Sequence, residues 1–125
     1  MIKALAPSPV LFACLLAGLA PVARADSPDI VAASAHRVGM GWRIDVTLRH
    51  PDTGWEHFAD GWEVLDAKGR RLGYRELMHP HVDEQPFTRA LVNLMLPDGN
   101  REVFIRARCS EAGWAGDTMR VELRY

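Results

Sequence analysis

The amino-acid sequence predicts an all-β protein, an antiparallel β-sandwich of about seven short strands. Apolar and polar residues alternate with a period of two through most of the chain after residue 25, and helical periodicity is not seen. Turn-forming residues interrupt the alternation every 8 to 12 residues or so, which is typical of a sandwich.

The first 25 residues predict a cleavable signal peptide. Lys3 provides the positive start, residues 10–19 form a short apolar run, and a small-x-small motif ends at Ala25. Cleavage there makes Asp26 the first residue of the mature chain. A membrane anchor is not expected, because a spanning helix needs about 20 apolar residues. We therefore expect an exported, periplasmic protein with no membrane insertion after cleavage.

Residues 26–125 have the length of one domain with a single core. Without Lys3 and Arg24 the chain has 13 basic and 16 acidic residues, a net charge of −3. The basic residues are scattered, so the composition excludes a nucleic-acid-binding stripe and a basic amphipathic membrane helix. Cys14 leaves with the signal peptide, and a lipid-attachment site there is not expected because little apolar sequence would precede it. Cys109 then stands alone, and an internal disulfide is excluded.

Three segments show the clearest alternation, 42–49, 102–109 and 118–125, each with one face expected to be buried. The inward-facing residues are Trp42, Ile44, Val46 and Leu48 in the first, Val103, Ile105, Ala107 and Cys109 in the second, and Met119, Val121, Leu123 and Tyr125 in the third. Because Cys109 follows this register, we expect a small buried apolar residue rather than a nucleophile.

Weaker alternation predicts four more strands, at 30–37, 61–66, 71–77 and 88–95, separated by turns rich in Gly, Asp and Lys. Seven strands in this order resemble an immunoglobulin or fibronectin type III fold. The missing cysteine pair argues against a true immunoglobulin domain, and the fold alone implies no function.

The strand order also predicts a working end of the domain. If consecutive strands run up and down, the connections near 50–60, 78–87 and 110–117 share one end. These connections are the longer ones, and they contain four of the five histidines and most aromatic residues. Binding residues concentrate on loops held by a rigid scaffold.

Two interpretations of the histidines remain open. Met78, His79 and His81, with His57 or His50 from the neighbouring connection, are donors that suit copper before zinc or nickel. Alternatively, the residues around Pro80 form a structural turn whose histidines bond to backbone. The spacing is not specific enough to choose.

The same end offers a candidate binding surface. Its members are Trp55, Phe58, Glu84, Phe87, Arg89 and Trp114. The aromatic residues suit a stacking platform for a sugar or peptide, or they cap the core. Glu84 and Arg89 are spaced to pair across the bend of their connection.

The sequence does not predict an enzyme. Nucleophile-elbow, zinc-protease and phosphate-loop motifs are absent. Cys109 with His57 or His79 could form a thiol–imidazole pair, but no third residue can be named to orient it.

Residues 55–64 (WEHFADGWEV) and 79–89 (HPHVDEQPFTR) resemble a family of small exported proteobacterial proteins without an assigned activity. The resemblance implies a periplasmic protein and no substrate. The sequence therefore predicts a non-enzymatic binding module with an envelope protein as partner, and a copper-binding protein as the alternative.

Overall fold

Eight β-strands and no helix form the part of the chain that the structure, a computed structural model, describes, residues 26–125. The strands are β1 (Asp29–Val38), β2 (Gly41–Arg49), β3 (Ala59–Leu65), β4 (Arg71–Glu76), β5 (Phe87–Leu94), β6 (Glu102–Cys109), β7 (Gly113–Trp114) and β8 (Met119–Glu122). The signal peptide predicted for residues 1–25 lies outside the described residues.

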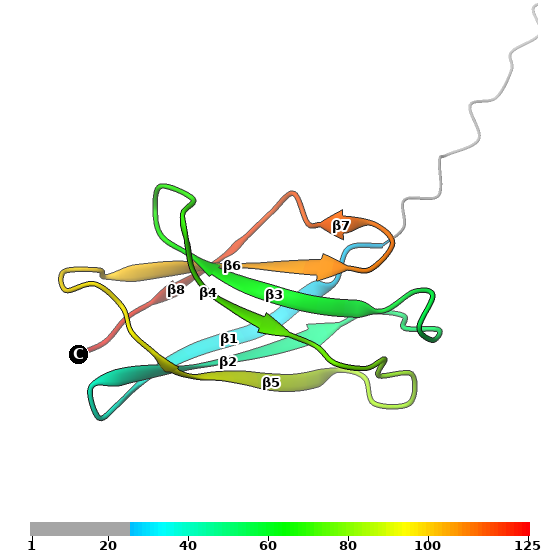
Figure 1. The fold of residues 1–125 in the computed structure, drawn as a ribbon, viewed down its shortest axis with the longest axis horizontal. Helices are drawn as coiled ribbons and strands as arrows, with labels where there is room; N and C mark the ends of the chain where they lie inside the picture. The colour runs from blue at the N-terminus through cyan, green and yellow to red at the C-terminus, as the bar shows by residue number, and fades with distance from the viewer. Residues whose placement is uncertain (1–25) are drawn as a thin grey trace, which may run out of the picture.

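The strands form two antiparallel sheets that pack face to face (Figure 1). One sheet has the order β1-β2-β5, and the other has the order β4-β3-β6, with β7 and β8 pairing successive parts of the free edge of β6. This arrangement confirms the predicted all-β sandwich of immunoglobulin or fibronectin type III type.

The core lies between the sheets and consists of the residues that the alternation placed there. Trp42, Ile44, Val46 and Leu48 of β2 are buried, as are Val103, Ile105, Ala107 and Cys109 of β6. Trp62 of β3 is completely buried, because both faces of this central strand are covered. Burial of each large apolar side chain stabilises the fold by about 1.5–3 kcal/mol.

The last strand differs from the prediction, which had one strand over 118–125. The structure shortens it to β8, which pairs with the first half of β6, and adds β7 within the predicted connection 110–117, where it pairs with Arg108 and Cys109. Gly113 has a φ of +78° and turns the chain back at once after β6. Tyr125, expected to face inward, is exposed and packs edge-on against Trp42 with ring centroids 5.3 Å apart.

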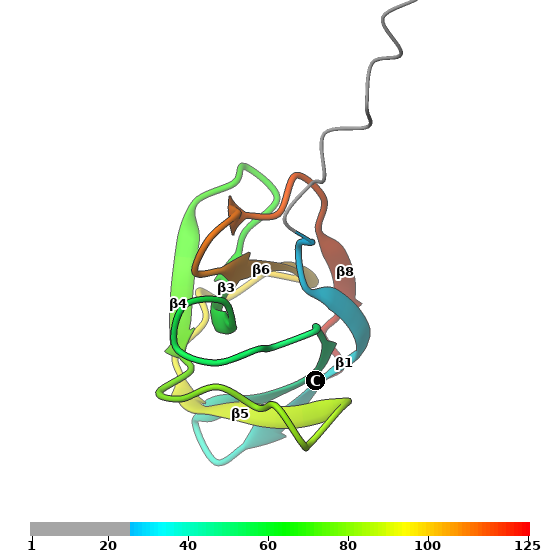
Figure 2. The same cartoon turned by 90° about the vertical axis from the view of Figure 1, so that its right-hand side faces the viewer.

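The connections separate into two ends, as the strand order predicted (Figure 1). The turn end holds the short connections 39–40, 66–70 and 95–101. The loop end holds the connections 50–58, 77–86 and 110–118. Two of the loop-end connections, 50–58 and 77–86, cross from one sheet to the other, and they lie together in the view onto that end (Figure 2).

Within residues 26–125, no helix is long and apolar enough to cross a membrane.

Candidate functional site

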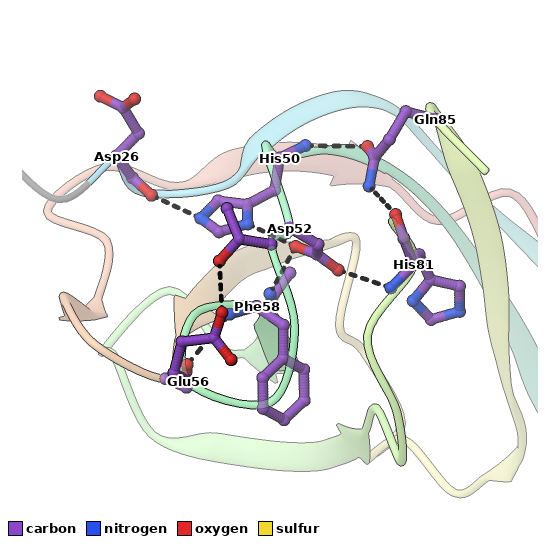
Figure 3. Close-up of polar contacts among 10 residues, drawn as sticks. Asp26, His50, Asp52, Glu56, Phe58, His81 and Gln85 are labelled. Atoms are coloured by element: carbon purple, nitrogen blue, oxygen red, sulfur yellow. Dashed lines mark hydrogen bonds and ion pairs between the residues drawn. The ribbon is translucent and has the colours of Figure 1, made fainter. Parts of the chain in front are cut away.

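A buried carboxylate, Asp52, connects the crossing loops of the loop end (Figure 3). Its Oδ1 atom accepts hydrogen bonds from the Ala59 backbone N–H at 2.9 Å and is 2.5 Å from His50 Nδ1. Its Oδ2 atom accepts from the His81 backbone N–H at 2.8 Å. The side chains of Asp52 and His50 are both fully buried. A single carboxylate therefore ties the 50–58 connection to the start of β3 and to the 77–86 connection.

Gln85 makes a second link between the same two loops (Figure 3). Its Oε1 atom accepts from the His50 backbone N–H at 3.0 Å, and its Nε2 atom donates to the His81 carbonyl at 2.9 Å. The third loop is attached through Ser110, whose Oγ accepts from the Phe58 N–H at 3.0 Å and whose N–H donates to the Phe58 carbonyl at 2.8 Å. Hydrogen bonds thus hold all three connections in fixed positions.

Both ring nitrogens of His50 face acceptors. Nδ1 lies beside the Asp52 carboxylate, and Nε2 lies 2.8 Å from the Asp26 backbone carbonyl. A neutral imidazole carries one N–H, so its tautomer decides which of the two acceptors receives the hydrogen bond. The contact between His50 and Asp52 lies inside the protein, where polar interactions are strong and where loss of either partner is costly.

The 50–58 connection contains a small hairpin, and the side chains of Trp55 and His57 lie against different neighbours. Thr53 N–H donates to the His57 carbonyl at 3.0 Å, and His57 N–H donates to the Gly54 carbonyl at 3.2 Å. Trp55, at the tip, is 69% exposed, and its ring meets Phe58 edge-on at 5.7 Å. The His57 ring instead lies against His50, with ring centroids 4.8 Å apart.

His50, His57 and Cys109 form a compact group at the end of the core. One donor atom of each residue lies within 4.8 Å of the others. Cys109 is fully buried at the end of β6, and His57 Nε2 is buried with no hydrogen-bond partner among the described residues. Of the groups of three or more His, Cys, Asp and Glu residues in 26–125, this is the one close enough to hold a metal ion.

Of the predicted copper ligands, His57 and its alternative His50 belong to that group, whereas Met78, His79 and His81 do not. His79 and His81 lie side by side, with ring centroids 4.6 Å apart, while His57 belongs to the group with Cys109. Met78 is 66% exposed, and His79 Nδ1 donates to the Pro80 carbonyl at 3.0 Å. The alternative of a structural turn accounts for these contacts.

His81 is a buried, neutral histidine. Its ring stacks flat on Phe87 at 3.9 Å, and its Nε2 atom accepts from Arg89 at 2.8 Å. The ring proton is then on Nδ1, which is buried without a partner among the described residues. Burial lowers the pKa of His81 first, and the nearby Arg89 and His79 lower it further. A guanidinium at Nε2 also repels a metal cation.

The remaining predicted surface residues have mixed positions. Glu84 and Arg89 form the expected ion pair, at 3.4 Å. Phe87 belongs to the core, so it supports His81 from below rather than meeting solvent. Trp114 lies across the sheet at β7, where Arg106 and Arg71 stack on its ring at 4.9 and 5.4 Å.

Those two arginines bond to Glu63, a buried carboxylate on β3. Arg71 and Arg106 each donate from Nε to Glu63 at 2.8 Å. Trp114 thus packs against the two arginines that neutralise the Glu63 carboxylate and against Tyr74, whereas Trp55 packs against Phe58.

Sequence reasoning missed Asp52, Gln85 and Ser110. Nothing in the sequence around Asp52 distinguishes it from an ordinary turn residue after Pro51, because its burial depends on loops that meet only in the fold. The one usable feature is the spacing of His50 and Asp52, two residues apart, at the end of a confident strand.

The chain is similar to a protein of an archaeon. A putative lipoprotein of the archaeon Halomicrobium mukohataei is 38% identical over 84 residues, which is 67% of this chain. The matched region spans 41% of that protein's length, so the chain corresponds to less than half of it. No family model matches the chain, and no solved structure matches it.

Proposed function

We propose that this chain is an exported, non-enzymatic binding module of the periplasm that uses its loop end to hold an envelope protein. The observation that carries this proposal is the buried network around Asp52, which joins the 50–58 and 77–86 connections at one end of the sandwich, while Ser110 attaches the third connection. Loops held rigidly on a sandwich bind with a smaller loss of conformational entropy than free loops.

The side chains available to a partner sit on these fixed loops. Trp55, Met78 and Val82 are exposed, and His79 and Glu84 accompany them on the 77–86 connection. Exposed tryptophan and methionine are enriched in the centres of protein interfaces, where they provide large contact areas. Trp55 is the expected anchor because Phe58 supports its ring.

Export is supported by the predicted signal peptide and by the relative. The matched archaeal protein is named a putative lipoprotein, and lipoproteins are exported. The chain's own leader favours cleavage after Ala25 over lipid attachment at Cys14. We propose the periplasm as the location of the exported chain.

The absence of catalysis is supported by the position of the best nucleophile. Cys109 lies beside His57, yet its side chain is fully buried, and no substrate atom can approach it without opening the core. Thiol catalysis needs a partly exposed, activated thiolate.

Copper binding by Met78, His57, His79 and His81 together has weaker support. His57 faces Cys109 rather than the other three, and Arg89 occupies His81 Nε2. A site with these four ligands requires rearrangement of the ion pair and of the stacked rings.

Site-specific photo-crosslinking tests the binding proposal. A photoreactive amino acid replaces Trp55 or Val82 at the loop end, and Met40 or Met95 at the turn end; all four residues are more than half exposed. In cells that export the protein, we expect one discrete cross-linked envelope protein from the loop-end positions alone. Equal products from both ends, or none from Trp55 and Val82, would rule out a loop-end interface.

A further inference from the structure

We propose that His50, His57 and Cys109 form a buried three-coordinate copper site, a function that goes beyond the binding surface of the loop tips. The three residues come from the end of β2, the inner side of the 50–58 hairpin and the end of β6. They therefore join the two sheets at the loop end, beneath the exposed side chains.

The donor atoms are close to metal-binding separation. They lie within 4.8 Å of one another, and donors about 2.0–2.3 Å from one ion lie roughly 3.5 Å apart. The difference is about an ångström, which side-chain rotation on a loop and at a strand end can supply. Cys109 is fixed by its strand, so the histidines would make the adjustment.

An unpartnered nitrogen supports the site independently of the spacing. His57 Nε2 is buried and has no hydrogen-bond partner within residues 26–125. Burial of a polar atom without a partner costs about 1–3 kcal/mol. A metal ion bound at that lone pair removes this cost.

Surrounding groups can orient the His50 ligand. Metal-bound histidines commonly donate their second N–H to a carboxylate or a backbone carbonyl. His50 has one of each, the Asp52 carboxylate and the Asp26 carbonyl, so one contact can open for the metal while the other holds the ring. A surface hollow lined by Asp26, His50 and Gln85 lies on the outer side of His50.

The donor set selects copper over zinc. Two imidazoles and one thiolate are the trigonal ligands of copper electron-transfer sites. Structural zinc takes four protein ligands, and catalytic zinc keeps a water, for which the buried side chains of His50 and Cys109 leave little access. On binding, the Cys109 thiol loses its proton to solvent, and each histidine binds through an unprotonated nitrogen.

Copper titration of the purified full chain tests the site. A Cys14→Ser background removes the other thiol. Cu(I) is added without oxygen in competition with a chromophoric chelator, and Cu(II) is added separately to detect thiolate-to-copper charge transfer in the visible spectrum. We expect one equivalent of copper to bind, with a melting temperature raised by about 10 °C at a hundredfold excess over Kd.

Single substitutions then assign the ligands. His57→Gln should lower copper affinity at least tenfold and leave the melting temperature of the metal-free protein close to its original value, since His57 Nε2 has no partner to lose. Cys109→Ala should abolish the charge-transfer band. His79→Gln is the matched control, an exposed histidine outside the group, and should change neither.

Three results would overturn the proposal. The first is no stoichiometric copper binding by the unsubstituted chain. The second is copper binding that survives His57→Gln and Cys109→Ala but is lost with His79→Gln. The third applies even if a variant fails to fold: an X-ray absorption spectrum of the unsubstituted copper complex without a sulfur ligand. Failure of the cross-linking experiment would leave this proposal untouched, because that experiment probes Trp55 and Val82.

Discussion

The two ends of the sandwich are stabilised by different chemistry, although both expose large apolar side chains. The turn end is closed by tight turns in which Gly39, Gly69 and Gly99 adopt positive φ. The loop end is closed by buried polar residues: of the four buried polar or charged residues within 26–125, three are found there, His50, Asp52 and His81. Exposed Met40 and Met95 at the turn end show that apolar exposure alone does not mark a binding surface.

The buried polar network of the loop end fixes a specific geometry that the tight turns of the turn end do not require. Local turn chemistry is sufficient to reverse a chain between strands. Buried polar networks are costly when any member is unsatisfied, and they fix one arrangement of the groups they join. A sandwich that needed only to fold could close both ends with turns. This contrast supports the proposal that the loop end carries the binding surface.

The largest expected effect comes from removing the central carboxylate. Asp52→Ala leaves the His50 ring and the Ala59 and His81 N–H groups without their acceptor, all in a dry environment. We expect a loss of about 3–5 kcal/mol in the free energy of unfolding, or a melting temperature lower by on the order of 15 °C. Thermal melts followed by circular dichroism measure it.

The matched control is Asp66→Ala at the turn end. Asp66 also accepts three hydrogen bonds, from the Lys68 and Arg70 N–H groups and from Arg70 Nε, each at 2.9 Å. Water can replace these bonds, so we expect a much smaller shift. Equal losses from the two variants would show that the two ends do not differ in the way described.

We expect a smaller effect on stability from lowering the pH. The folded-state pKa of His81 lies below the ordinary value of 6.5, because burial and the neighbouring Arg89 and His79 disfavour its charged form, against weaker opposing effects of Glu84 and Asp52. As pH falls through 6.5, the unfolded chain takes up a proton that the folded chain does not, so His81 makes stability fall. Its contribution is complete above pH 6.5 and is lost toward its folded-state pKa.

Melting temperatures between pH 7.5 and pH 5 test this sign. His81→Gln should flatten the decline, while His36→Gln, at an exposed histidine of β1 that is not among the groups acting on His81, should leave it unchanged. Hydrogen exchange should show the loop-end amides of Ala59 and His81 opening earlier in acid than the turn-end amides of Gly69 and Arg70. A decline that is identical in His81→Gln would remove His81 from the explanation.

The contrast between the ends also explains what the sequence could predict. Period-two alternation identified the buried residues of β2 and β6, because the apolar face of a strand is set by its own local sequence. Strand order then placed His50, His57, His79 and His81 at one end. It could not show which ones touch, since that depends on Asp52 and Gln85, polar residues whose burial follows from the packing of separate loops. Their pairing with His50 and His81 is a property of tertiary structure.

The smallest effect on stability should come from the residue with the largest expected effect on binding. Trp55 is 69% exposed and contacts Phe58 by one ring edge, so Trp55→Ser should change the free energy of unfolding by about 0.5 kcal/mol or less. Met40→Ser, at an 82% exposed position of the turn end, should be equally mild. Binding to the cross-linked partner, once purified, should separate them: titration calorimetry should show affinity reduced at least tenfold by Trp55→Ser and unchanged by Met40→Ser, because interface tryptophans carry a large share of binding energy. If both variants bind equally well, Trp55 is not the anchor of the interface. The contact with the partner would then be made by the 77–86 connection.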